Sequence, residues 1–208
     1  MPTVPHSDPA ELGQNLFYGI GVRKNYRKAF PLLLEAAELG HIHCQNVVGF
    51  CYDRGFGVDR DVAKALFWYE QAAQNDHQVA LFNLARFYET GKVIARDLER
   101  ALSLYKRAAA LGDVPAACNL GVMYELGKGT EVDRTEAIHW TRYAAQRGDA
   151  KAQYNLGICY DEGIGVAKNR RWTAHWMRKA AAQGHPGALE FLEQEGARCK
   201  TKTLQTLL

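Results

Sequence analysis

Residues 149–184 read DAKAQYNLGICYDEGIGVAKNRRWTAHWMRKAAAQG, and most of the chain repeats this pattern with different surface residues. One alanine and one tyrosine recur every 36 residues: Ala36, Ala72, Ala108, Ala144 and Ala180, and Tyr52, Tyr88, Tyr124 and Tyr160. A fixed period of this length is typical of a solenoid, in which each unit buries its apolar face against its neighbours. The repeat therefore predicts an architecture, and it does not name a bound partner.

Each unit has the pattern of two helices. From Ala152 onward, apolar and small residues lie at helical spacing, with Asp149 as N-cap and Gly163 as the left-handed residue that ends the helix. A second helix begins after Asn169 and ends at Gly184. The equivalent first caps are His41, His77, Asp113 and His185, the equivalent glycines are Gly19, Gly55, Gly91 and Gly127, and the equivalent second caps are Asn25, Asp61, Asp97 and Asp133.

The unit pattern A-x-x-N-L-G-x-x-Y-x-x-G-x-G-V-x-x-[DN]-x-x-x-A-x-x-W-x-x-x-A-A-x-x-G resembles the Sel1-like repeat, a relative of the tetratricopeptide repeat with a longer loop between its helices. The departures are local: Val93 replaces the second loop glycine, Thr130 the loop valine, Asn75 and Asp76 the closing Leu-Gly pair, and Val47 the asparagine. The resemblance implies a right-handed superhelix whose first helices line a concave groove that binds other proteins. Catalysis is not the usual activity of the family.

The predicted fold is all-α, a right-handed α/α superhelical solenoid of about five Sel1-like helix pairs with a partial sixth. Residues 1–7 form a flexible lead, and the solenoid occupies residues 8–196 as one elongated domain. Its units are 8–40, 41–76, 77–112, 113–148 and 149–184, followed by a partial cap at 185–196. For the tail, residues 197–208, two alternatives stand: it is disordered, or its leucines cover the open end of the last helix pair.

Charge and apolar content exclude several classes of protein. The net charge of +3 comes from interspersed signs, so we expect a solvated surface and no nucleic-acid partner. No apolar run is long enough to cross a bilayer, and the first residues lack the pattern of a signal peptide, so we expect no membrane association. The expected location is the cytoplasm, or an extracytoplasmic compartment if a presequence was removed. We expect a monomer.

The five cysteines are predicted to be reduced. Cys44 and Cys51 share a helix and lie about 10 Å apart along its axis, which is beyond disulfide reach. Cys44, Cys51 and Cys159 occupy positions that are apolar in other units, so they are predicted core residues. The second helices are predicted to bury Trp68, Leu104, Trp140 and Trp176, with Tyr69 and Tyr105 beside two of them.

Two sets of residues match known chemical motifs, and neither is expected to form a site. Ser103 and Lys106 match the S-x-x-K string of penicillin-recognising enzymes. Some cysteine-rich members of the resembled family are described as binding penicillin. The S-D-N and K-T-G motifs that accompany the string in such enzymes are missing from this sequence. A penicillin-binding or β-lactamase-like hydrolase therefore remains an alternative function, and a weak nucleic-acid binder is another. His139 and His175, or His41, His43 and Cys44, do not supply a convergent ligand set, so no metal or cofactor is expected.

The candidate binding surface is the groove that the resemblance implies. The residue before the repeated leucine is Asn83, Asn119 or Asn155, and an amide both donates and accepts hydrogen bonds, so these side chains can hold the backbone of an extended peptide. The neighbours predicted to face the groove are Phe50, Phe82, Arg86, Cys118, Val122, Lys151, Tyr154 and Ile158. The alternative is that the asparagines bond between adjacent helices and serve the stack. The favoured function is a non-catalytic protein–protein interaction scaffold that binds a protein or peptide segment.

One acidic residue follows each repeated tyrosine: Asp53, Glu89, Glu125 and Asp161. A carboxylate in the last turn of a helix opposes the helix dipole, which costs about 0.3–1 kcal/mol. Each therefore needs a compensating group, which is either a basic residue of the protein or a group on a partner.

Overall fold

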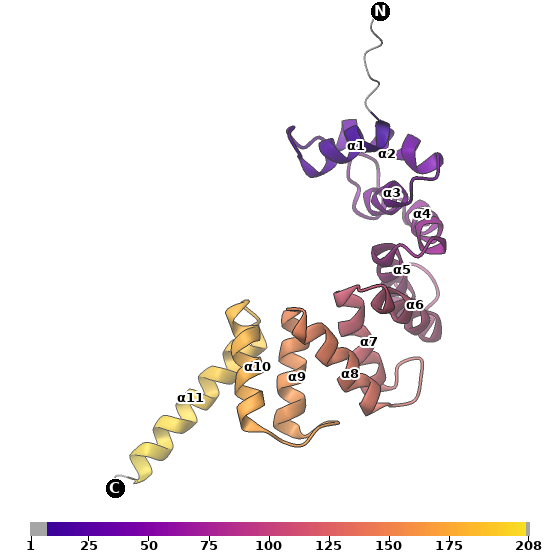
Figure 1. Ribbon diagram of the computed structural model, residues 1–208. Helices are drawn as coiled ribbons and strands as arrows, with labels where there is room; N and C mark the ends of the chain where they lie inside the picture. The colour runs from indigo at the N-terminus through magenta and orange to yellow at the C-terminus, as the bar shows by residue number, and fades with distance from the viewer. Residues whose placement is uncertain (1–7, 207–208) are drawn as a thin grey trace, which may run out of the picture. The chain divides into compact units, whose positions relative to one another are not determined.

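The computed structural model describes residues 8–206, with side chains described through residue 196. The lead predicted for residues 1–7 and the last two residues lie outside this range. The described chain is all-helical, as predicted (Figure 1). Its helices are α1 (Pro9–Tyr18), α2 (Tyr26–Glu38), α3 (Ile42–Arg54), α4 (Val62–Gln74), α5 (Gln78–Thr90), α6 (Leu98–Ala110), α7 (Val114–Leu126), α8 (Arg134–Gln146), α9 (Ala150–Glu162), α10 (Arg170–Ala182) and α11 (Pro186–Thr206).

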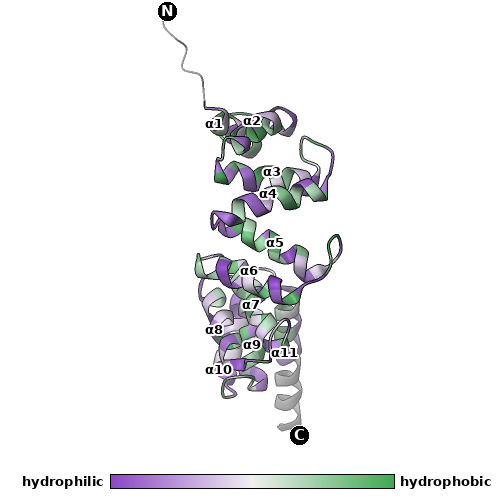
Figure 2. Cartoon of the chain, turned by 90° about the vertical axis from the view of Figure 1, so that its right-hand side faces the viewer, coloured by the Kyte–Doolittle hydropathy of each residue, from purple (hydrophilic) through white to green (hydrophobic). Residues whose placement is uncertain are grey.

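The chain divides into two compact units, one ending at Leu111 and the other beginning at Gly112. The first contains α1–α6 and the second α7–α11, and in both each helix packs against the next along the chain. This division lies inside the single domain predicted for residues 8–196. Figure 2 shows hydrophobic and hydrophilic residues interspersed along the helices, as expected when each helix has a buried and a solvated face. None of the described helices has the length and apolar character that a bilayer crossing requires.

The helix ends follow the predicted caps closely. Gly163 has a left-handed φ of 78°, and its N–H donates to the Cys159 carbonyl at the end of α9. All five second helices begin with an Asn or Asp side chain that accepts a backbone N–H. Among the first helices, the cap is confirmed at His77, Asp113 and Asp149, but His41 makes no side-chain cap hydrogen bond.

In at least three of the repeats, the two helices touch at a glycine of the first helix. A Cβ built on Gly121 of α7 would overlap Thr141 Oγ1 of α8, and one built on Gly157 of α9 would lie 3.0 Å from the Met177 side chain of α10. Gly49 of α3 has the same relation to Tyr69 of α4. A Cβ at 3.0 Å or less from a neighbouring atom would force that neighbour to shift, so glycine sets the spacing of these three helix pairs. In the pair of α5 and α6 the equivalent residue is Ala85, which is fully buried.

The predicted aromatic core is confirmed in all positions but one. Trp68, Leu104, Trp176, Tyr69 and Tyr105 are buried. Trp140 is only partly buried, because its indole Nε1–H donates to the Glu136 carboxylate one turn earlier and stays near the surface. The cysteines at 44, 51 and 159 are buried free thiols, as predicted, and so is Cys118.

The last helix closes the second unit. The first half of α11 places Ala188 against Met177 and Ala180 of α10, with Phe191 and Leu192 at the edge of this cluster. Glu193 occupies the position of the contact glycines and is exposed, and no helix follows α11 within residues 8–206 to pack on it. The backbone of α11 stays helical through Thr206, well into the tail that was predicted to begin at residue 197. The side chains of that segment lie outside the described residues.

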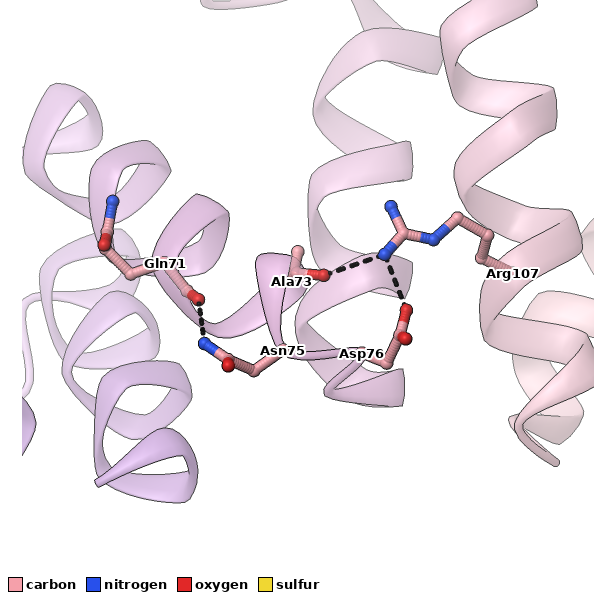
Figure 3. A network of polar contacts seen from close by, with 5 residues as sticks. All are labelled: Gln71, Ala73, Asn75, Asp76 and Arg107. Carbon is pink, nitrogen blue, oxygen red and sulfur yellow. Dashed lines mark hydrogen bonds and ion pairs between the residues drawn. The ribbon is translucent and has the colours of Figure 1, made fainter. Parts of the chain in front are cut away.

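A polar network ties α6 to the end of α4 at the unusual Asn75-Asp76 junction (Figure 3). Arg107 Nη2 lies 2.6 Å from Asp76 Oδ1 and donates to the Ala73 carbonyl at 3.1 Å. Asn75 donates to the Gln71 carbonyl at 3.2 Å. Asp76 is the one described non-glycine residue with a positive φ, 54°, and the equivalent positions in the other repeats are glycines.

We predict that Gly121→Glu destabilises the protein by about 2–4 kcal/mol, because the side chain overlaps Thr141 and carries a charge into the helix contact. The control is Gly196→Glu in α11, where an added Cβ meets no atom within 4 Å. Urea unfolding of both variants measures the effect. Equal stabilities for the two variants would contradict the proposed role of the glycine contact.

We predict that Asp76→Gly is more stable than Asp76→Ala by about 1 kcal/mol, because both lose the Arg107 ion pair but only glycine accepts the left-handed backbone without strain. Thermal unfolding of the two variants measures the difference. Equal melting temperatures would mean that the backbone at residue 76 relaxes out of this conformation.

Candidate functional site: the faces of the first helices

The ten residues predicted to bind a partner all lie on first helices, and all are at least partly exposed. In the first unit they are Phe50 of α3 and Phe82, Asn83 and Arg86 of α5. In the second unit they are Asn119 and Val122 of α7 and Lys151, Tyr154, Asn155 and Ile158 of α9. Cys118, also expected on this face, is instead only 3% exposed and belongs to the core.

In the second unit, α7 and α9 are linked through two of these residues. Lys151 Nζ donates to Asn119 Oδ1 at 3.3 Å, so the amide of Asn119 serves a contact between neighbouring repeats. Asn155 makes no side-chain hydrogen bond within residues 8–196. The alternative that the asparagines bond between adjacent helices is therefore supported by a hydrogen bond at Asn119 and by none at Asn155.

The contacts between α11 and the exposed face of α9 were not predicted from the sequence. The Tyr154 ring stacks on His185 with 4.5 Å between centroids, and it approaches Gly187 so closely that an added Cβ would lie 3.0 Å from the ring. Tyr154 and Ile158 also pack on the Met177 cluster. Both residues therefore contribute to the closure of the second unit as well as to its surface.

In the first unit, the predicted residues divide between an aromatic cluster and a cavity. The Phe50 ring lies 6.4 Å from Phe17 and 5.6 Å from Phe56, centroid to centroid. Asn83 and Arg86 instead line a cavity of about 250 Å³ between α3, α5 and their following loops. The Arg86 guanidinium carbon lies 5.8 Å from the centroid of Phe82.

The periodic carboxylates have internal compensation at two positions. Asp53 pairs with Arg54 at 3.3 Å, and Glu89 accepts a hydrogen bond from the Tyr105 hydroxyl at 2.8 Å. The backbone carbonyls of the same two residues accept from Arg60 and Arg96 at 2.9 and 3.0 Å, respectively. These arginines occupy the same position of successive loops, and they place a cation at the negative end of α3 and of α5.

The other two carboxylates have different surroundings. Burial raises the pKa of Glu125, and the nearby Glu162 raises it further. Asp161 lines a second cavity, of about 290 Å³, with Lys168 and Arg170. Both cavities therefore lie where the end of a first helix meets the following loop.

Ser103 and Lys106 lie exposed on α6 and line neither of the two cavities. Within the described residues, no group of three or more His, Cys, Asp or Glu side chains could hold a metal ion. His43 contacts His77 with 5.7 Å between ring centroids, and burial lowers the pKa of both.

Comparison with known families decides the assignment of the fold. The profile of the Sel1 repeat matches five consecutive segments, residues 10–41, 42–77, 78–113, 114–149 and 150–185. The chain belongs to the Sel1 repeat family. These segments are displaced by about one residue from the units read off the sequence, and they include the first, irregular unit.

Solved structures agree with this assignment. A Sel1 repeat protein from Oxalobacter formigenes is 29% identical, with a TM-score of 0.83, over 91% of this chain and 78% of that protein. A protective antigen from uropathogenic Escherichia coli strains is 35% identical, with a TM-score of 0.81, over 86% of this chain but only 38% of the antigen. An immunity protein, PA5088 from Pseudomonas aeruginosa, shares the fold at 23% identity and a TM-score of 0.57, over 92% of this chain and 70% of that protein. No curated protein matches the chain.

The buried thiols of this Sel1 repeat protein are not poised as nucleophiles. Burial raises the pKa of Cys51, Cys118 and Cys159 to about 12 in each case, and it raises the pKa of Cys44 as well. A thiol reacts as its thiolate, so these groups stay unreactive near neutral pH while the chain is folded.

The raised thiol pKa values predict that stability falls as the pH rises from about 9 toward 12. In that range the unfolded chain ionises thiols that the folded chain keeps protonated, so the stabilisation present below pH 9 is lost. Urea unfolding at about pH 8 and pH 10 measures the change, and a Cys118→Ala/Cys159→Ala variant should show a smaller one. An equal fall in that variant would assign the effect to other groups.

Proposed function

We propose that the chain is a non-catalytic scaffold that binds a protein or peptide segment on the exposed faces of its first helices. The observation that supports it most is that the ten predicted binding residues are all at least partly exposed, although the neighbouring Cys118 is buried, while the repeated leucines and alanines beside them are buried. Membership of a repeat family whose proteins commonly act as interaction scaffolds supports the same function. The four described free thiols are compatible with a reducing compartment, and we propose the cytoplasm.

The binding residues differ in what they can offer. Asn83 and Asn155 keep side-chain amides without a bond inside residues 8–196, so they are the stronger candidates to hold a peptide backbone. Asn119 is engaged by Lys151, and a ligand would have to share or replace that bond. Apolar surface beside the amides comes from Phe82 in the first unit and from Val122 in the second.

We predict that Asn83→Ala/Asn155→Ala reduces capture of the native partner at least about tenfold, because a partner backbone loses two amide contacts. The partner is captured by cross-linking from a lysate of the native host and quantified by mass spectrometry. Stability should change by less than about 0.5 kcal/mol, since neither amide bonds to the stack.

The control variant is Gln74→Ala/Gln146→Ala, which removes two exposed amides from second helices at the same repeat spacing. It should capture the partner as the parent does. Full capture by the asparagine variant would place recognition on another surface, and a large loss of its stability would assign the asparagines to the stack.

A further inference from the structure

We propose that the cavity of the first unit binds the carboxylate groups of an acidic peptide segment. This inference rests on the proposed function, and it names the chemistry of the segment that the first unit recognises. The cavity lies at the ends of α3 and α5 and in the loops that follow them. Its charged lining consists of four cations and one acid: Arg54, Arg60, Arg86, Lys92 and Asp53.

The internal ion pair does not neutralise this lining. Asp53 pairs with Arg54, and the Nε of Arg60 is held by the Asp53 carbonyl. Arg86 and Lys92 are exposed and make no ion pair with any residue between 8 and 196. The cavity thus keeps an excess of positive charge, which attracts an anionic ligand and most strongly at low salt.

The repeat architecture does not require the cation at Arg86. Arg86 occupies a position that is Gln14 in the first repeat and Phe50, Val122 and Ile158 in the other three, so packing of the stack accepts an uncharged residue there. The carbonyls at the ends of α3 and α5 already have arginine donors, from Arg60 and Arg96 respectively. Arg86 therefore has neither a periodic nor a capping role within the stack.

The cavity coincides with a departure from the repeat. The loop glycines Gly57 and Gly165 have positive φ and lie so close to the preceding second helix that an added Cβ would overlap it. Val93 stands at the equivalent position of the loop after α5, lacks a positive φ, and lines the cavity. The irregular loop and the unpaired cations thus occur together in one repeat.

The remaining lining favours a peptide over a free ion. Asn83 can bond the backbone of a bound segment, and Phe87 supplies an apolar wall beside the cations. A volume of about 250 Å³ is near the lower end for small-ligand sites, so it suits one or two acidic side chains of an extended segment.

The test is fluorescence anisotropy with short labelled peptides in which leucine alternates with glutamate, glutamine or phosphoserine. The variant Arg86→Gln/Lys92→Gln removes two cavity cations that make no internal ion pair. The control Arg27→Gln/Lys28→Gln removes one arginine and one lysine from the exposed surface of α2, in the same unit and outside the cavity lining. Melting temperatures establish that both variants fold.

We expect the parent to bind the glutamate peptide at least about tenfold more tightly than the glutamine peptide, with affinity falling as salt rises. The cavity variant should lose about tenfold in affinity for the glutamate peptide, and the control should retain parental affinity. Equal binding of the glutamate and glutamine peptides, or an equal loss in the control, would overturn the proposal. Tighter binding of the phosphoserine peptide would also overturn it, because the cavity would then select phosphate over carboxylate.

The same variants separate this inference from the proposed function. If the native partner is lost in Asn83→Ala/Asn155→Ala but retained in full by Arg86→Gln/Lys92→Gln, the scaffold function stands and the carboxylate site is overturned. If the glutamate peptide depends on the cavity cations while the asparagine variant captures the partner in full, the carboxylate site stands and the first-helix face is not the main docking surface.

Discussion

Close approach of the two helices within each repeat is the contact on which the other features depend. At Gly121 and Gly157 the backbone of a first helix lies directly against a side chain of the second, so a single missing Cβ sets the distance between them. That distance lets alanines such as Ala144 and Ala180 be fully buried beside larger residues. Because packing density in such an interface is near that of a crystal, the pair has little room to adjust, and its outer surface is correspondingly well defined.

The ends of the helices carry the second regular constraint. Side-chain caps satisfy the first N–H groups, and left-handed glycines such as Gly163 satisfy the last carbonyls and turn the chain toward the next helix. Where the repeat departs from this chemistry, the chain adds a local contact. Asp76 takes a glycine position and pairs with Arg107, and Val93 takes another and borders a cavity.

Periodicity explains why most of the fold could be predicted. The contact glycines, the caps and the buried alanines recur at one spacing, so each repeat is evidence for the others. Features that occur once were missed, since no second copy shows them: the stacking of Tyr154 on His185, the exposed edge of Trp140, and the burial of Cys118. The cavity had a signal in the sequence, the replacement of a loop glycine by Val93, but only the folded chain shows that Arg86 and Lys92 converge there.

The difference between repeated and single features matters for the location of the proposed binding residues. A residue that is the same in every repeat is explained by the packing of the helices, which requires it in each repeat. An extended partner of ordinary sequence, in contrast, presents a different side chain to each repeat. In the proposed scaffold, selectivity therefore comes from positions at which the repeats differ. The position of Arg86 meets this requirement, because the five repeats have a polar, an aromatic, a cationic and two aliphatic residues there, while its helix neighbour Leu84 matches Leu120 and Leu156. In the proposed scaffold, the amides beside the leucines hold the partner's backbone, and the varying position selects its side chains.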